Sequence, residues 1–154
     1  MKQDSQALEL YRSIGNSSGE AGVLSEMGNT LRYQGDFTRS QQSIEQALSL
    51  QRSLGDRSAE ANSLNNLGLL YQAQNQLDQA RSNYEQSLQI ARELDNHTGT
   101  AATLNNIGSI YDDQEQFQQA IDIYEQALSL VRESGDRSGE ATTLNNIGSS
   151  LLSL

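Results

Sequence analysis

Pairs of adjacent asparagines recur inside apolar stretches, and their amides are the most regular candidates for binding chemistry. The doublets are Asn65/Asn66, Asn105/Asn106 and Asn145/Asn146, each 40 residues after the last. Amides donate and accept hydrogen bonds, so this ladder could hold the backbone of an extended or helical peptide. It could also bond neighbouring helices and fix their stacking, and one asparagine of a doublet could do each job. An unsatisfied buried amide costs about 1 to 3 kcal/mol, so these groups must be solvated, paired or available to a ligand.

Residues for catalysis or metal binding are sparse. The chain has no cysteine, and its one histidine, His97, lies in the sequence LDNHTG, which reads as a turn. A lone imidazole supports neither a metal site nor a nucleophile–base pair. Asp112 and Asp113 are adjacent, but neighbouring helical side chains diverge by about 100° and rarely hold one ion. We therefore expect no catalytic residue, no metal site and no cofactor.

Charge and composition narrow the partner class. Twenty acidic and ten basic side chains in 154 residues give a formal charge of -10. This charge would repel phosphate groups, so we expect neither nucleic acid nor membrane as a partner and favour a neutral or basic protein segment. The N-terminal MKQDSQALEL lacks the apolar core of a signal peptide, and no run approaches about 18 apolar residues. We expect a cytoplasmic protein.

The elements that carry the asparagines repeat with the same period. Glycines recur at Gly28, Gly68, Gly108 and Gly148, and proline is absent. In one repeat, apolar residues fall at helical spacing in two segments, first at Ala61, Leu64, Leu67 and Tyr71, then at Leu77, Ala80, Tyr84 and Leu88. The pattern predicts an all-α fold of antiparallel helix pairs, about seven helices in total, stacked as a solenoid. It also predicts four core tyrosines: Tyr71, Tyr84, Tyr111 and Tyr124.

Boundary signals divide the chain into one array over residues 1–154. Residues 1–15 form the second helix of a partial repeat, 16–55, 56–95 and 96–135 form full repeats, and 136–154 form the first helix of a truncated repeat. Between repeats, a glycine such as Gly55 or Gly135 can end one helix, and Asp56 or Asp136 can cap the next. We expect Arg57 and Arg137 to pair with Glu60 and Glu140.

This pattern resembles the tetratricopeptide repeat family. The matching residues in one repeat are Leu64, Leu67, Gly68, Tyr71, Ala80 and Tyr84. The period is 40 residues instead of the usual 34, which resembles the long-repeat branch of kinesin light chains and Pins/LGN-type polarity adaptors. The resemblance implies a right-handed superhelical solenoid without enzymatic activity. It also implies a scaffold that binds a peptide or partner segment in a concave groove lined by each repeat's first helix.

On those first helices the asparagines lie opposite the core side, since successive residues are separated by about 100°. The residues that we expect to contact a peptide share this outward position. They are Arg32, Tyr33, Asn62, Asn65, Asn66, Leu69, Gln72, Asn105, Asn106, Ser109, Asp112, Asn145 and Asn146.

The two ends of the array suggest an alternative function. The last helix would expose the apolar residues Leu144, Ile147 and Leu151, and the first helix carries Leu8 and Tyr11. Full exposure costs up to about 1.5 to 3 kcal/mol for each large apolar side chain. The alternative is a self-associating structural segment whose terminal helices pack head to tail or swap into an oligomer.

Overall fold

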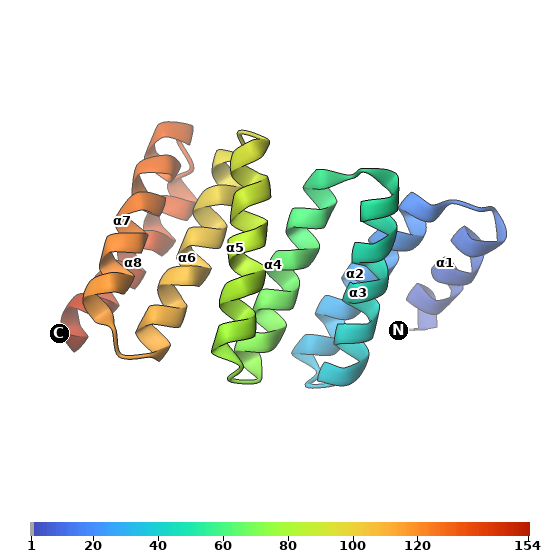
Figure 1. Cartoon of the computed structure of the whole chain (residues 1–154), viewed down its shortest axis with the longest axis horizontal. Coiled ribbons are helices and arrows are strands. Elements are labelled where there is room, and N and C mark those ends of the chain that lie inside the picture. Colours follow the sequence, from blue (N-terminus) through green and yellow to red (C-terminus); the bar gives the residue numbers. More distant parts are fainter. Residues whose placement is uncertain (1) are drawn as a thin grey trace. The chain divides into compact units, whose positions relative to one another are not determined.

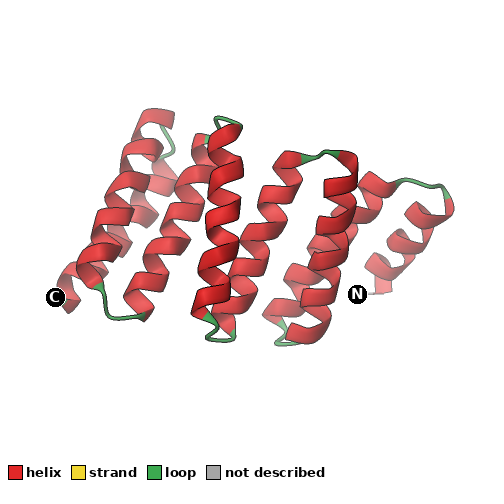
Figure 2. Ribbon diagram, in the orientation of Figure 1, coloured by secondary structure: helices red, strands yellow, loops and turns green. Residues whose placement is uncertain are grey.

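A computed structural model describes residues 2–154, with side chains from Asp4 onward. Within these residues it contains eight α-helices and no strand (Figure 1; Figure 2). The predicted all-α class is confirmed. The structure has one helix more than the predicted number of about seven, and the predicted repeat boundaries account for all eight, with two helices from each of three full repeats and one from each partial repeat. The chain divides into two compact units, residues 1–76 and 77–154.

Unit 1 contains α1 (Lys2–Ser13), α2 (Ser17–Tyr33), α3 (Phe37–Leu54) and α4 (Arg57–Ala73). Helices α2 and α3 pack together most extensively, α1 packs on α2, and α4 packs on α3 and touches α2. Leu24, Leu31 and Ile44 are among the buried residues between them. Gly28 allows the closest approach, since a Cβ there would overlap the Ile44 side chain.

Unit 2 contains α5 (Leu77–Glu93), α6 (His97–Asp113), α7 (Phe117–Ser134) and α8 (Arg137–Ser153). Helix α6 packs against α5 and α7, and α8 packs against α7 and touches α6. In Figure 1, α5 and α7 lie in front of α6 and α8. Because α8 touches α6, the first helices of the two repeats in this unit are neighbours.

The predicted caps and turns are confirmed. Gly55 and Gly135 end α3 and α7 with φ of 69° and 72°, the left-handed region where glycine is favoured. The Asp56 side chain accepts a hydrogen bond from the Ala59 N–H at the start of α4. Asp136 does the same for α8. A left-handed glycine therefore ends α3 and α7, and an aspartate side chain caps the start of α4 and α8.

Two of the four predicted core tyrosines are fully buried, and the other two are partly buried. Tyr84 and Tyr124 on the second helices are fully buried. Tyr71 and Tyr111, near the ends of the first helices, are half-exposed. The Tyr111 ring is covered on one side by the Arg81 guanidinium, whose carbon lies 5.1 Å from the ring centroid. The Arg81 guanidinium thus helps to cover the partly buried Tyr111 ring.

Candidate functional site

The asparagine doublets lie beside the core and do not enter it. On α4, Leu64 and Leu67 are buried while Asn65 and Asn66 are half-exposed. Helix α6 repeats this division. On both helices the apolar stripe packs inward and the amides reach the boundary with solvent.

Asn105 links the two first helices of unit 2. Its Nδ2 donates to the Thr143 Oγ1 of α8 at 2.9 Å and to the Ala101 carbonyl oxygen at 3.1 Å. Its Oδ1 accepts from Asn146 Nδ2 at 3.3 Å. Thr143 is fully buried, so the Asn105 amide supplies a partner in a place that excludes water. For Asn105 and Asn146, the hydrogen bonds favour the stacking role.

An equivalent polar contact joins the first helices of unit 1. Ser25 Oγ on α2 lies 3.3 Å from Ser63 Oγ on α4, and Gln51 Nε2 of α3 donates to Ser25 Oγ at 3.2 Å. The pair is separated by 38 residues, as are Asn105 and Thr143. Neighbouring first helices are thus joined in the same register by different side chains.

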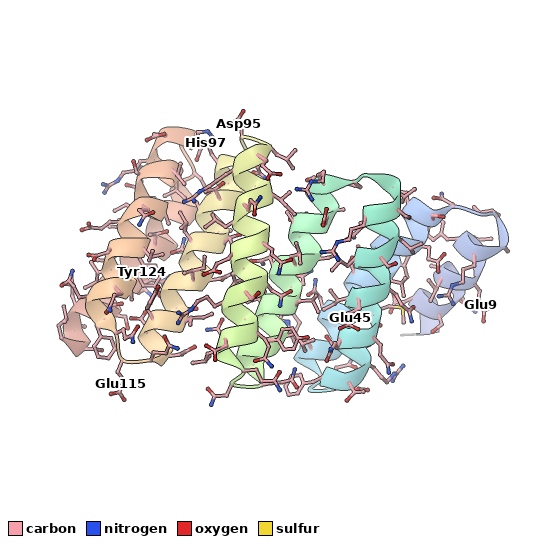
Figure 3. The ribbon with its side chains drawn as sticks, viewed as in Figure 1. Glu9, Glu45, Asp95, His97, Glu115 and Tyr124 are labelled. Atoms are coloured by element: carbon pink, nitrogen blue, oxygen red, sulfur yellow. The ribbon has the colours of Figure 1, made fainter. Side chains whose placement is uncertain are left out.

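Asp112 is also occupied within unit 2. It accepts hydrogen bonds of 2.7 Å from the Tyr124 hydroxyl of α7 and from Ser150 Oγ of α8. Burial raises the pKa of Tyr124, and the hydrogen bond to Asp112 raises it further. Figure 3 shows Tyr124 in the middle of its unit. Asp112 of α6 therefore connects α7 and α8 through its carboxylate. Among the described residues, no group of three metal-ligating side chains is present.

A hollow of about 360 Å³ lies between the N-terminal halves of α6 and α8. Two predicted residues, Asn105 and Asn106, contribute to its wall, together with Ala102, Asp136, Ser138 and Thr142. The last four were not among the predicted contact residues. For two of them, Ala102 and Thr142, the signal in the sequence was the 40-residue step that places each one helical turn before a doublet.

The two predicted residues at the end of α2 contact each other. The Arg32 guanidinium carbon lies 4.2 Å from the centroid of the Tyr33 ring, and Tyr33 is 81% exposed. Two buried polar atoms near this end, Asn29 Oδ1 and Arg32 Nε, have no hydrogen-bond partner in the described part of the chain. Both atoms are buried, so of these groups only the exposed Tyr33 ring is open to a partner at this end of α2.

The remaining predicted contact residues lie on the first helices of each unit. Asn62 and Asn145 are exposed, and Asn66, Leu69 and Gln72 are half-exposed. Ser109 is half-exposed and its hydroxyl donates to the Asn106 carbonyl oxygen at 2.8 Å. The residues of α2 and α4 belong to unit 1, whereas those of α6 and α8 belong to unit 2.

The predicted self-association residues are exposed to different degrees. On α8, Leu144 and Leu151 are 44% and 56% exposed, while Ile147 is half-buried. On α1, Leu8 and Tyr11 are half-buried. Tyr11 packs closely on α2, because a Cβ at Gly19 would overlap its ring. Of the five predicted residues, Leu144 and Leu151 are therefore the exposed ones.

Comparison with known proteins identifies the family. A family model described as tetratricopeptide repeat matches residues 19–93, 60–133 and 99–154 in overlapping stretches. The chain belongs to the tetratricopeptide repeat family. Tetratricopeptide repeats are typically a non-catalytic protein-interaction fold, which supports a scaffold for protein partners. No curated protein sequence matches the chain significantly.

Solved structures share the tetratricopeptide repeat fold at low sequence identity. BtubC (BKLC) from P. vanneervenii matches 99% of this chain and 64% of its own at 23% identity, with a TM-score of 0.85. Aspartyl phosphate phosphatase F from Bacillus subtilis matches 86% of this chain and 39% of its own at 17% identity, with a TM-score of 0.73. A Podosopora anserina protein described as a putative kinesin light chain with nearly identical TPR-like repeats matches 99% of this chain and 85% of its own. The sequence identity is 14% and the TM-score is 0.69. These likenesses show the fold alone, and the chain spans less than two thirds of the first two proteins.

None of the described helices combines the length and apolar character that a membrane span requires.

Proposed function

We propose that this chain is a non-enzymatic scaffold that binds a peptide or partner segment along the first helices of its repeats. The observation that carries the proposal is the hollow between α6 and α8, with Asn105 and Asn106 in its wall. The hydroxyls of Ser138 and Thr142 can bond a peptide backbone, while Ala102 leaves room for it. As part of the proposal, residues 1–154 form a single array with the repeat boundaries predicted above.

The two asparagines of a doublet have separate roles in this proposal. Asn105 and Asn146 hold α6 against α8, as their hydrogen bonds indicate. Asn145 is exposed, so it can contact a peptide without leaving a helix–helix contact unpaired.

The charge of the hollow favours a neutral or basic segment. Asp136 lies in its wall, and the wall contains no lysine or arginine. Capture of a C-terminal carboxylate would require cations there, so an internal peptide segment suits the site better. The formal charge of -10 acts in the same direction.

A peptide selection with a blocking variant tests this proposal. Peptides are selected from a random library on the whole chain and then measured on Ala102→Arg, which places a long side chain in the hollow. Gln119→Arg on the exposed side of α7 adds the same charge and serves as the matched control. We expect at least tenfold weaker binding for Ala102→Arg and no change for the control. Equal binding to both variants would place the peptide elsewhere.

The exposed apolar surface of α8 favours the alternative function of self-association. Leu151 is 56% exposed and Leu152 is 92% exposed. In this alternative, the surface packs on α1 of a second copy, which is a heterologous contact. Sedimentation velocity over a hundredfold concentration range tests it with Leu151→Glu. Association that weakens in the variant supports it, whereas a monomer at every concentration excludes it.

A further inference from the structure

An arginine–glutamate ion pair recurs at three of the four junctions between repeats. The arginine lies in the last turn of a second helix, and the glutamate lies eight residues later in the first turn of the next helix. The Nε to Oε1 distances are 2.6 Å for Arg12–Glu20, 2.8 Å for Arg52–Glu60 and 2.8 Å for Arg132–Glu140. At Glu60 the ion pair outweighs the effect of burial. Burial raises the pKa of Glu60, but hydrogen bonds from Arg52 and Arg57 together lower it by more, so the pKa lies below its ordinary value.

The fourth junction keeps the arginine and lacks the acid. Arg92 lies in the last turn of α5, and the residue eight positions later is Thr100, which is 6% exposed. Arg92 forms no ion pair within residues 4–154. The next basic position also differs, because His97 occupies the place of Arg57 and Arg137. This junction therefore has two basic side chains and no glutamate to join them.

A hollow of about 410 Å³ lies at this junction, between α5 and α7 and beside the start of α6. Its lining includes Arg92, Asp95, His97, Thr100, Leu104 and Leu130. The equivalent hollow in unit 1, about 340 Å³, is lined by Arg12, Leu24 and Leu50 and also contains Glu20. The hollow of unit 1 thus contains the acid that pairs with its arginine, Glu20, whereas the hollow around Arg92 has Thr100 at the same position.

Asp95 is the one carboxylate in the lining of the hollow. It lies at the tip of the turn between α5 and α6, close to His97 (Figure 3). Asp95 replaces the glycine found at Gly15, Gly55 and Gly135, and its φ is 52°. No ion pair joins Asp95 to Arg92 among the described residues. Asp95 therefore does not substitute for the missing glutamate.

We propose that the hollow at this junction binds a glutamate-like carboxylate supplied from outside the chain. The carboxylate pairs with the Arg92 guanidinium, as glutamate does at the other junctions, and His97 and the Thr100 hydroxyl offer further donors. Its aliphatic part packs on Leu104 and Leu130. The volume lies within the usual range for a small-ligand site. This site has lining residues from α5, α6 and α7, and it shares none of them with the proposed peptide site between α6 and α8.

Calorimetric titration with two probes tests the proposal and identifies the source of the carboxylate. One probe is glutamate capped at both its amino and carboxyl ends, and the other is a capped pentapeptide with one glutamate between two leucines. We expect one site per chain. Binding of both probes assigns the site to free carboxylates, and binding of the peptide alone assigns it to a partner's side chain. Binding of neither probe overturns the proposal.

Three variants show whether the missing acid creates the site. Thr100→Glu restores the internal pair, so we expect at least tenfold weaker binding together with a higher unfolding midpoint. Arg92→Met removes the cation and has the same effect on binding without that gain in stability. Glu20→Thr opens the hollow of unit 1, and we expect a second binding site. Unchanged affinity in both Thr100→Glu and Arg92→Met would overturn the proposal.

Discussion

Two glycines at equivalent positions of α6 and α8 should respond oppositely to the same substitution. A Cβ at Gly108 would meet the Tyr124 ring, with Cδ1 at 2.7 Å and Cζ at 2.8 Å, whereas normal carbon contacts are about 3.5 to 4.0 Å. A Cβ at Gly148 would meet nothing within 4 Å. Gly108→Ala therefore inserts a methyl group into packed space, and Gly148→Ala inserts it into open space.

The magnitudes follow from these surroundings. Replacing glycine by alanine inside a helix gains up to about 1 kcal/mol in either variant. At Gly108, overpacking costs about 1 to 3 kcal/mol. Movement of Tyr124 also weakens its bond to the Asp112 carboxylate, of a kind that contributes about 1.5 to 3 kcal/mol. We expect a net loss of about 2 to 4 kcal/mol for Gly108→Ala and a gain of up to about 1 kcal/mol for Gly148→Ala.

Urea unfolding followed by far-ultraviolet circular dichroism measures both variants against the unmodified chain. A change of 1 kcal/mol shifts the melting temperature of a chain of this size by about 2 to 4 °C, so thermal unfolding provides a second reading. Equal effects in the two variants, or a Gly108→Ala chain as stable as the original, would refute the packing of α6 against α7 described above.

Three further perturbations probe the polar contacts. Asn105→Ala removes a hydrogen-bond partner of the buried Thr143 hydroxyl, so the free energy of unfolding in urea should fall by about 1 to 3 kcal/mol. Asn145 is exposed, so Asn145→Ala should change that free energy by less than about 0.5 kcal/mol. Because the pKa of Tyr124 is raised in the folded state, stability should fall above pH 10, and Tyr124→Phe should reduce that slope by about 1.4 kcal/mol per pH unit; equal slopes would contradict the burial. The pKa of Glu60 is lowered in the folded state, so its contribution to the free energy of unfolding is present above pH 4.5 and is lost as the pH falls through the lowered pKa. The difference in stability between Glu60→Gln and the unmodified chain should therefore shrink at low pH.

The sequence predicts the helices well because their signals are local. Helical spacing of apolar residues, an aspartate N-cap such as Asp56 and a left-handed glycine such as Gly55 act within a few residues of one another. The same local rules missed the positive φ of Asn75 and Glu115, which replace Gly35 in the later repeats. At these positions the place in the repeat requires a positive φ, and the residue types Asn and Glu do not indicate it.

The polar contacts between helices were harder to predict, since they join residues about 40 positions apart. Asn105 with Thr143, and Asp112 with Ser150, share a separation of 38 residues. A search for polar pairs at this separation would find both. Helical phase alone predicted Asp112 as a peptide-contacting residue. Phase gives the direction of a side chain, but it does not identify the residues of other helices that lie in that direction.

Shift mapping of a selected peptide on the isotopically labelled chain tests the central claim most directly. The proposal predicts the largest amide shift changes at Ala102, Asn106 and Thr142, whose helices border the hollow of unit 2. It predicts little change at Gln119 on the exposed side of α7. Changes concentrated on α5 and α7, with α6 and α8 unaffected, would contradict peptide binding by the first helices.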